Sequence, residues 1–229
     1  MANKGETKCL KLQKAHKISG IDKTKRFLIN PKPGKHNKST AVSIGFVLRD
    51  ILHLADNARE IKYIINNKEI IVDKKKVSEH RLPVGLFDVI EIPKINKLYR
   101  VISTSNGSYS VKEITKDESN YKVCKIVKKT VVKKGQIQIV TNDGRTIITT
   151  NKAYKPKASI KIDLLEGTIK EYYPLEKGSE ILVINGKHVG QIGKITAVTP
   201  GTMQRHELIK AKTKSFEFET IEKNVIVIN

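Results

Sequence analysis

The sequence NAREIKYIINNKEIIVDKKKVSEHRLPVGLFDVIEI, residues 57–92, organises the expected fold of the chain. Asn57 is followed three residues later by Glu60, a capping-box pattern that predicts the start of a helix. The paired asparagines Asn66 and Asn67 predict its end, because asparagine tolerates the left-handed backbone conformation. A short helix is therefore expected between these two signals.

This expected helix has one apolar face and one charged face. Ile61, Ile64 and Ile65 recur at helical spacing and predict the buried side. Arg59 and Lys62 then lie on the exposed side. The pattern is typical of a helix that packs on one face and offers cations to solvent on the other.

Two short strands are expected after the helix. Ile70–Val72 and Val89–Ile92 are both rich in Ile and Val. A helix followed by a strand, with cations at their junction, makes a compact surface for binding phosphates. The cations between the two strands are Lys74, Lys75, Lys76, His80 and Arg81.

The stretch resembles the S-four-type RNA-binding module, a small helix–helix–strand unit of several RNA-associated proteins. Two departures are Asp73-Lys74, where the module usually has Asn-Gly, and Phe87, where a Gly is common. Neither removes a charge needed for phosphate contact, and the alternative is an ordinary α+β unit with a solvated basic turn. The matching residues are Arg49, Asp50, Asn57, Ala58, Arg59, Ile70, Ile71, Val72 and Gly85 through Ile90.

The segments before this stretch differ in character. Residues 41–55 carry apolar residues at helical spacing and predict the first helix of the module. His53 is expected on its polar edge and not as a metal ligand, since no other ligand type lies at useful spacing.

Residues 1–40 form a basic arm with 11 Lys and Arg against two acids, interrupted by Pro31 and Pro33. We expect this arm to be disordered alone and ordered on RNA, with a solubilising tail as the alternative.

Composition indicates a polyanion as partner. The 229 residues include 44 Lys and Arg against 23 Asp and Glu, a net charge of +21 that costs stability unless an anion neutralises it. No stretch approaches the roughly 18 apolar residues of a membrane span, and the start is too charged for a secretory signal. Cys9 and Cys124 have no metal-type spacing, so a reducing compartment is expected. The absence of Trp disfavours stacking on single strands and favours folded RNA.

Residues 98–173 are expected to be rich in short strands. Asn106-Gly107 predicts a hairpin turn between residues 98–103 and 108–114. Asp143-Gly144 predicts a second hairpin. Strands at this spacing indicate a small barrel or sandwich. Several lysines suggest that part of this region also meets RNA: Lys122, Lys125, Lys128, Lys129, Lys133 and Lys134.

Near the C-terminus, the sequence ILVINGKHVGQIGKI, residues 181–195, predicts a strand, a glycine-spaced turn and a second strand. It resembles the KOW motif of small barrels in ribosomal proteins and transcription elongation factors. An alternative is a glycine-rich hairpin in an SH3-like barrel. Val225 and Val227 predict a last strand. The match covers Gly186, Gly190, Gly193, Ile195 and Val198.

The order of these parts resembles the eukaryotic and archaeal type of small-subunit ribosomal protein four over nearly the whole chain. The expected fold class is α+β and multidomain: a basic arm (1–40), an S-four-type module (41–97), a central β-rich domain (98–173) and a KOW, SH3-like barrel (174–229). Family members often continue with a basic tail, whereas this chain stops at Asn229. The resemblance implies a cytoplasmic component of the small ribosomal subunit, assembled in the nucleolus if the organism is eukaryotic.

The resemblance also implies partners and chemistry. Ribosomal RNA and neighbouring small-subunit proteins are the expected partners, with no membrane, small-molecule substrate, cofactor, metal or catalysis. The alternatives are a KOW-containing transcription elongation or RNA-chaperone factor and, as a third class, an RNA-modifying enzyme using Asp143 with Arg145. Asp143-Gly144 is better explained as a turn. The candidate RNA contacts are Lys4, Lys8, Lys11, Lys14, Lys17, Arg26, Lys35, Lys38, Arg49, Arg59, Lys62, Lys74, Lys75, Lys76, Arg81, Lys125, Lys128, Lys129, Lys187 and Lys194.

Overall fold

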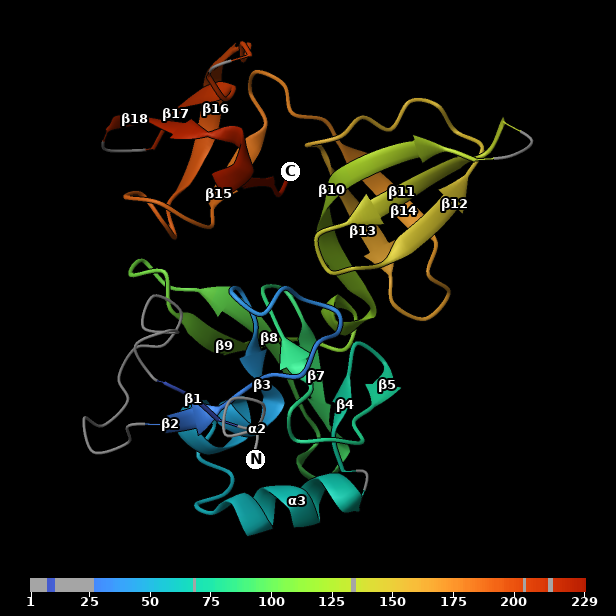
Figure 1. The fold of residues 1–229 in the computed structure, drawn as a ribbon, viewed down its shortest axis with the longest axis vertical. Coiled ribbons are helices and arrows are strands. Elements are labelled where there is room, and N and C mark those ends of the chain that lie inside the picture. Colours follow the sequence, from blue (N-terminus) through green and yellow to red (C-terminus); the bar gives the residue numbers. More distant parts are fainter. Residues whose placement is uncertain (1–7, 11–26, 68, 133–134, 204, 214–215) are drawn as a thin grey trace, which may run out of the picture. The chain divides into compact units, whose positions relative to one another are not determined.

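The structure is a computed structural model that describes residues 8–10, 27–67, 69–132, 135–203, 205–213 and 216–229. The chain divides into two compact units (Figure 1). The first contains residues 1–102 and 108–122, and the second contains residues 103–107 and 123–229. The described chain is mostly β-structure with few helices. The expected α+β character is therefore found only in the first unit, where both described α-helices lie.

An antiparallel sheet of five strands, in the order β5-β4-β7-β8-β9, forms the frame of the first unit. Val72 pairs with Ile90, which in turn pairs with Tyr99. Val72, Val89 and Ile90 are fully buried, which explains why these Ile/Val runs fold as central strands. The bounds are β4 (Ile71–Val72), β5 (Lys75–Lys76), β7 (Val89–Ile92), β8 (Lys97–Ser103) and β9 (Tyr109–Glu113).

Strands β8 and β9 complete this first sheet. The prediction that residue 98 opens a separate β domain is therefore wrong at this boundary, because the register of β7 with β8 joins them. The predicted Asn106-Gly107 turn is confirmed, with Gly107 at φ 78°. A 3-10 turn at Pro93–Ile95 lies between β7 and β8, and another at Glu118–Asn120 follows β9.

The first predicted helix is shorter than residues 41–55. Val42–Ser43 form a strand, β3, that pairs with β6 (Pro83–Val84), so the helix begins only at Ile44. The Ser43 hydroxyl caps it by accepting a hydrogen bond from the Phe46 amide at 3.3 Å. The helix α2 (Ile44–Phe46) continues as a π-helical turn over Val47–Ile51.

The second predicted helix is confirmed as α3 (Ala58–Asn66). The Glu60 carboxylate accepts hydrogen bonds from the backbone amides of Asp56, at 2.8 Å, and Asn57, at 3.3 Å. The expected left-handed ending is wrong, since Asn67 has φ −73°. Its amide instead donates to the Tyr63 carbonyl at 3.1 Å, which extends the helical turn.

The prediction of a disordered arm is wrong for residues 27–40. Strand β2 (Phe27–Ile29) pairs with β1 (Lys8–Leu10), and Leu28, Asn30 and His36 are buried. A buried polar contact, from His36 to Asp88, also holds this segment, and no local sequence pattern indicates it. Residues 1–7 and 11–26 lie outside the described part of the chain.

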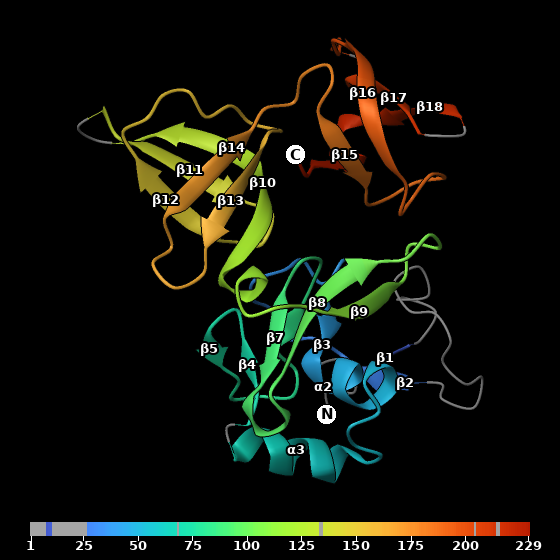
Figure 2. The ribbon, with the colours of Figure 1, turned by 180° about the vertical axis from the view of Figure 1, so that it is seen from behind.

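The second unit contains two sheets with separate cores. The first, in the order β12-β11-β10-β13-β14, curves into a half-barrel (Figure 2). Cys124 is buried in its core together with Ile139 and Ile160. The predicted Asp143-Gly144 turn is confirmed, with Gly144 at φ 76°. The bounds are β10 (Tyr121–Val131), β11 (Ile137–Thr141), β12 (Thr146–Thr149), β13 (Ser159–Asp163) and β14 (Ile169–Tyr173).

The other sheet has the order β18-β17-β16-β15-β19. The expected strand–turn–strand is present, and Gly186 and Gly190 take φ values of 94° and 78° that other residues rarely adopt. The last strand is confirmed and pairs with β15. The bounds are β15 (Glu180–Val183), β16 (Ile192–Thr199), β17 (Leu208–Lys212), β18 (Glu217–Ile221) and β19 (Val225–Val227), with a 3-10 turn at Glu222–Asn224.

Within the described ranges, no helix has the length and apolar character that crossing a membrane requires.

Candidate nucleic-acid interface

A buried cluster of charges lies in the interior of the first unit. The Lys122 ammonium group donates to the carboxylate of Asp88 and, at 3.3 Å, to that of Asp73. His36 Nε2 lies 2.9 Å from both Asp88 oxygens, and Lys35 Nζ lies 2.8 Å from Asp73. Lys122, Asp73 and Asp88 are essentially inaccessible to solvent. The prediction that Lys122 belongs to an RNA-facing group is therefore wrong.

Backbone amides complete this cluster. The Val89 amide donates to Asp73 and the Gly85 amide to Asp88, each at 3.0 Å. Burial alone raises the pKa of Asp88, but the positive charge of Lys122 and then that of His36 hold it well below its usual range. The carboxylate stays ionised, so the cluster ties residues 35 and 36 and the start of β10 to the sheet.

Three residues near the cluster have left-handed backbone conformations. Asp73, Lys74 and Phe87 have φ values of 48°, 62° and 65°. These are the positions where the S-four-type module usually has Asn-Gly and Gly, residues that adopt positive φ readily. At these three positions the side chain differs from the usual residue of the module, whereas the backbone keeps the left-handed conformation. The buried contacts of Asp73 with Lys122 and Lys35 offset the local strain.

Helix α3 presents the clearest candidate RNA surface. Ile61 and Ile65 are buried, whereas Arg59, Lys62 and Tyr63 are exposed. Their spacing places the two cations and the ring on one stripe of the helix. Tyr63 is 67% exposed. Tyr63 was missed because the sequence argument treated aromatics only as a total; its spacing of four residues from Arg59 was the available signal.

His80 adds a titratable group beside this stripe. Partial burial and then the positive charge of Lys62 lower the pKa of His80, and Arg81 acts in the same direction. Arg81 Nε also donates to the Asn30 carbonyl at 3.1 Å, which orients the guanidinium. The loop before β6 therefore contributes to the same basic surface as α3.

The hairpin of β4 and β5 provides a second group of cations. Lys75 and Lys76 are exposed. Lys74 is directed elsewhere, since its ammonium group lies 2.6 Å from Glu91 and 3.1 Å from the Ser119 hydroxyl. Of the three predicted lysines, only Lys75 and Lys76 are positioned for phosphates.

The second unit separates its predicted contacts in the same way. Lys128 and Lys187 are exposed, whereas Lys129 donates to the Lys152 carbonyl at 2.7 Å. The Lys125 ammonium group donates to the carbonyls of Glu222 and Val225, and burial lowers its pKa to about 8. Lys125 therefore joins the two sheets of this unit, which corrects its prediction as an RNA contact.

The remaining predicted contacts fall into three groups. Lys38 is exposed, whereas Lys35 is paired with Asp73. Arg49 Nη2 lies 2.8 Å from Asp50, and Lys194 Nζ lies 3.9 Å from Glu180. Outside the described side chains are Lys4, Lys8, Lys11, Lys14, Lys17 and Arg26.

Asp143 has no arrangement suited to catalysis. Its carboxylate accepts hydrogen bonds from the Thr141 hydroxyl and the Arg145 amide, and lies 2.9 Å from Arg145 Nε. The side chain is buried, and these bonds brace the turn between β11 and β12. Among the described residues, no group of three or more His, Cys, Asp or Glu is placed to hold a metal ion.

A β-rich chain with a net charge of +21 and exposed cations on a short helix is of the class of basic ribosomal proteins. More particularly, the chain belongs to ribosomal family S4e, and the sequence model of that family matches residues 95–169. It is 38% identical to small ribosomal subunit protein eS4 of Nanoarchaeum equitans over 202 residues, 88% of this chain and 86% of the relative.

Two further relatives support the assignment. Small ribosomal subunit protein eS4 of Methanosphaera stadtmanae is 36% identical and is matched over 100% of this chain and 95% of its own. The crystal structure of 30S ribosomal protein S4e from Thermoplasma acidophilum matches with a TM-score of 0.71 at 30% identity, over 82% of this chain and 95% of that one. The predicted family is therefore confirmed.

Proposed function

We propose that this protein is a structural constituent of the small ribosomal subunit, binds ribosomal RNA there and has no catalytic activity of its own. The observation that carries the proposal is the near full-length similarity to proteins named as small ribosomal subunit protein eS4. The site of action is then the cytoplasmic ribosome, beside small-subunit RNA and neighbouring proteins of the subunit.

The stripe of Arg59, Lys62 and Tyr63 on α3 is our proposed first contact with RNA. Two exposed cations on rigid helical backbone can each neutralise a phosphate and release a counterion. Tyr63 directly follows Lys62, one helical turn after Arg59, and can pack on a ribose or an unpaired base. Arg81 extends this surface, and the exposed pair Lys75 and Lys76 is a second candidate contact in the same unit. Recognition should depend on RNA shape more than on base edges, since the contacts are mostly with phosphates.

We also propose a finer assignment of the parts. The S-four-type module comprises α2, α3 and the sheet of β4, β5, β7, β8 and β9, and its basic arm precedes residue 27. The half-barrel of β10–β14 is the central domain. The sheet of β15–β19 is a KOW-containing, SH3-like barrel, supported by left-handed Gly186 and Gly190 in the turn after β15.

A transcription elongation or RNA-chaperone factor is the second candidate, and the glycine-spaced turn after β15 is the feature that favours it. Fractionation separates the two functions. A ribosomal constituent co-sediments with small subunits after a moderate salt wash, and the purified chain binds deproteinised small-subunit RNA. Release into the soluble fraction, with no RNA binding at physiological ionic strength, would refute the proposal.

A further inference from the structure

One face of the C-terminal sheet carries balanced charges, although the chain as a whole is strongly basic. In register across four strands, Glu180 pairs with Lys194, Lys194 with Lys212, and Lys212 with Glu217. Lysines thus occupy the centre of the row and glutamates its two ends. Lys212 Nζ lies 3.2 Å from Glu217, and Lys194 Nζ lies 3.9 Å from Glu180.

A second pair on the same face repeats this pattern. Lys210 pairs in register with Glu219, and their charged atoms lie 2.8 Å apart. The bond to Glu219 raises the pKa of Lys210, so this lysine stays charged. Each of the three lysines on this face therefore has a carboxylate within 4 Å. Three cations and three carboxylates give the face a net charge of zero, in a chain whose total is +21.

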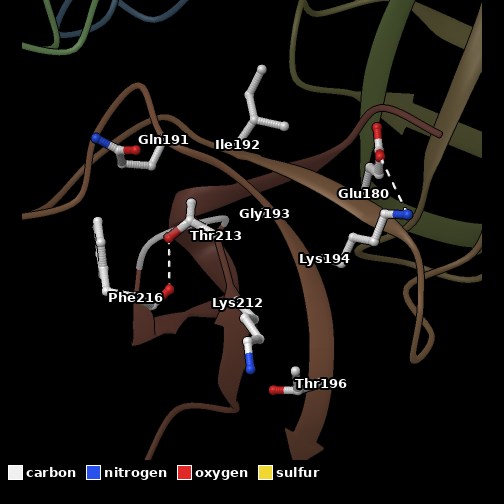
Figure 3. Close-up of a pocket in the computed structure, with 9 residues that line it drawn as sticks. All are labelled: Glu180, Gln191, Ile192, Gly193, Lys194, Thr196, Lys212, Thr213 and Phe216. Atoms are coloured by element: carbon white, nitrogen blue, oxygen red, sulfur yellow. Dashed lines mark hydrogen bonds and ion pairs between the residues drawn. The ribbon is translucent and has the colours of Figure 1, made fainter.

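The same face is hollowed and partly apolar. An open pocket of about 610 Å³ lies over β16 and the end of β17 (Figure 3). Ile192 is 57% exposed and Phe216 is 42% exposed at its wall. Figure 3 shows the Lys194 side chain turned toward Glu180, away from Lys212. Lys194 and Lys212 both line this open pocket, so an incoming group can reach them.

This combination does not suit RNA. The phosphates of an RNA backbone follow one another closely, so Glu180 and Glu217 at the ends of the row would face phosphates even where the central lysines attract one of them. An exposed apolar pair rimmed by charges of both signs is typical of a protein interface. The charge order also selects a partner, since a carboxylate fits between the central lysines and a cation or amide fits each glutamate.

We propose that this face docks a neighbouring protein and not RNA. The face is defined by Glu180, Ile192, Lys194, Thr196, Lys210, Lys212, Phe216, Glu217 and Glu219. The partner segment carries a large apolar side chain for the space beside Ile192 and Phe216, next to an acidic residue that enters between Lys194 and Lys212. This replaces the sequence prediction that Lys194 contacts RNA.

Photocrosslinking within the assembled particle tests the proposal. The probe is p-benzoylphenylalanine in place of Thr196, an exposed residue of the pocket wall, in the full chain. Small subunits that contain the chain are purified by sedimentation and irradiated, which first establishes that the chain is incorporated. The expected adduct contains a second polypeptide and withstands ribonuclease. An adduct that ribonuclease removes, or incorporation without any adduct, would overturn the proposal.

Paired variants provide the control. Ile192→Ser with Phe216→Ser should reduce the protein adduct about tenfold or more, since it removes the apolar anchor. Val127→Ser with Ile148→Ser removes two similarly exposed apolar side chains, 59% and 60%, from the other sheet and should leave the adduct unchanged. Both variants should bind isolated small-subunit RNA within about twofold of the unsubstituted chain. Equal adduct loss in both variants, or lost RNA affinity in the first, contradicts the assignment.

Discussion

The ammonium group of Lys122 donates to the carboxylate of Asp88 in the interior of the first unit, across 34 residues of sequence. Neither side chain is accessible to solvent beyond 1%. Burying an ion pair removes the hydration of both charges, and their mutual attraction offsets this cost only in part. The pair therefore fixes the local geometry more reliably than it adds net stability. Here it holds the start of β10 against the loop before β7, and His36 extends the tie to residues 27–40.

Removing the cation from this cluster should destabilise the protein. Lys122→Met leaves Asp73 and Asp88 with fewer positive partners in a buried site, and we expect a loss of about 3–5 kcal/mol in the free energy of unfolding. Denaturant titration measures it. Lys128→Met, at an exposed position on the same strand, is the matched control and should change stability by no more than about 0.5 kcal/mol. Equal effects of both substitutions would contradict the structural role of Lys122.

Acid should weaken the same cluster. The folded-state pKa of Asp88 lies below its ordinary value of 3.8, so the unfolded chain takes up the proton first as pH falls. The stabilisation from Asp88 is therefore fully present above about pH 5 and declines as pH drops below 4. Asp88→Asn should be less stable at pH 7, and the difference from the unsubstituted protein should narrow between pH 4 and 2. A constant difference over this range would show that Asp88 does not titrate as described.

Gly85 should not tolerate a side chain. A Cβ atom at this position would lie 2.6 Å from His36 Nδ1 and Cε1, inside normal contact distance. His36 is held by Asp88 and cannot move without breaking that pair. Gly85→Ala should therefore cost about 1–3 kcal/mol of unfolding free energy, measured by denaturant titration. A variant as stable as the original protein would mean that the ring of His36 is free to shift.

Lys125 should give the second unit an unusual response to alkali. Burial lowers its pKa to about 8 from 10.5, so the unfolded chain holds this proton over a range where the native protein has lost it. Stability from this group then increases as pH rises from about 8 to 10.5. The unsubstituted protein should gain stability relative to Lys125→Met between pH 7.5 and 10. A loss over that interval would reverse the sign that we assign.

The elements with local signals were predicted correctly. The capping pattern of Asn57 and Glu60 places α3, and Asn106-Gly107 and Asp143-Gly144 place two hairpin turns. Each signal depends on residues within a few positions of each other, which a sequence displays directly. The same holds for Gly186 in the turn after β15.

The errors concern contacts between distant residues. Residues 27–40 looked unstructured because their anchor is the pairing of His36 with Asp88, 52 positions away. Lys122 and Lys125 looked like surface cations because no residue near them in the sequence indicates the carboxylates and carbonyls that enclose them. Charge counts predict the class of partner, but only the fold separates paired lysines from available ones.

The central claim is that available cations, led by those on α3, bind small-subunit RNA. The direct measurement is the salt dependence of binding of deproteinised small-subunit RNA by three forms of the full chain: unsubstituted, Arg59→Ala with Lys62→Ala, and Lys210→Ala with Lys212→Ala. The last removes the same charge from lysines already paired with Glu219 and Glu217.

The α3 variant should bind more weakly, with the slope of log affinity against log salt reduced in magnitude by about 2 and the thermal midpoint unchanged. The β17 variant should keep the slope of the unsubstituted chain. Equal slopes for all three forms, or a loss confined to the β17 variant, would contradict the account.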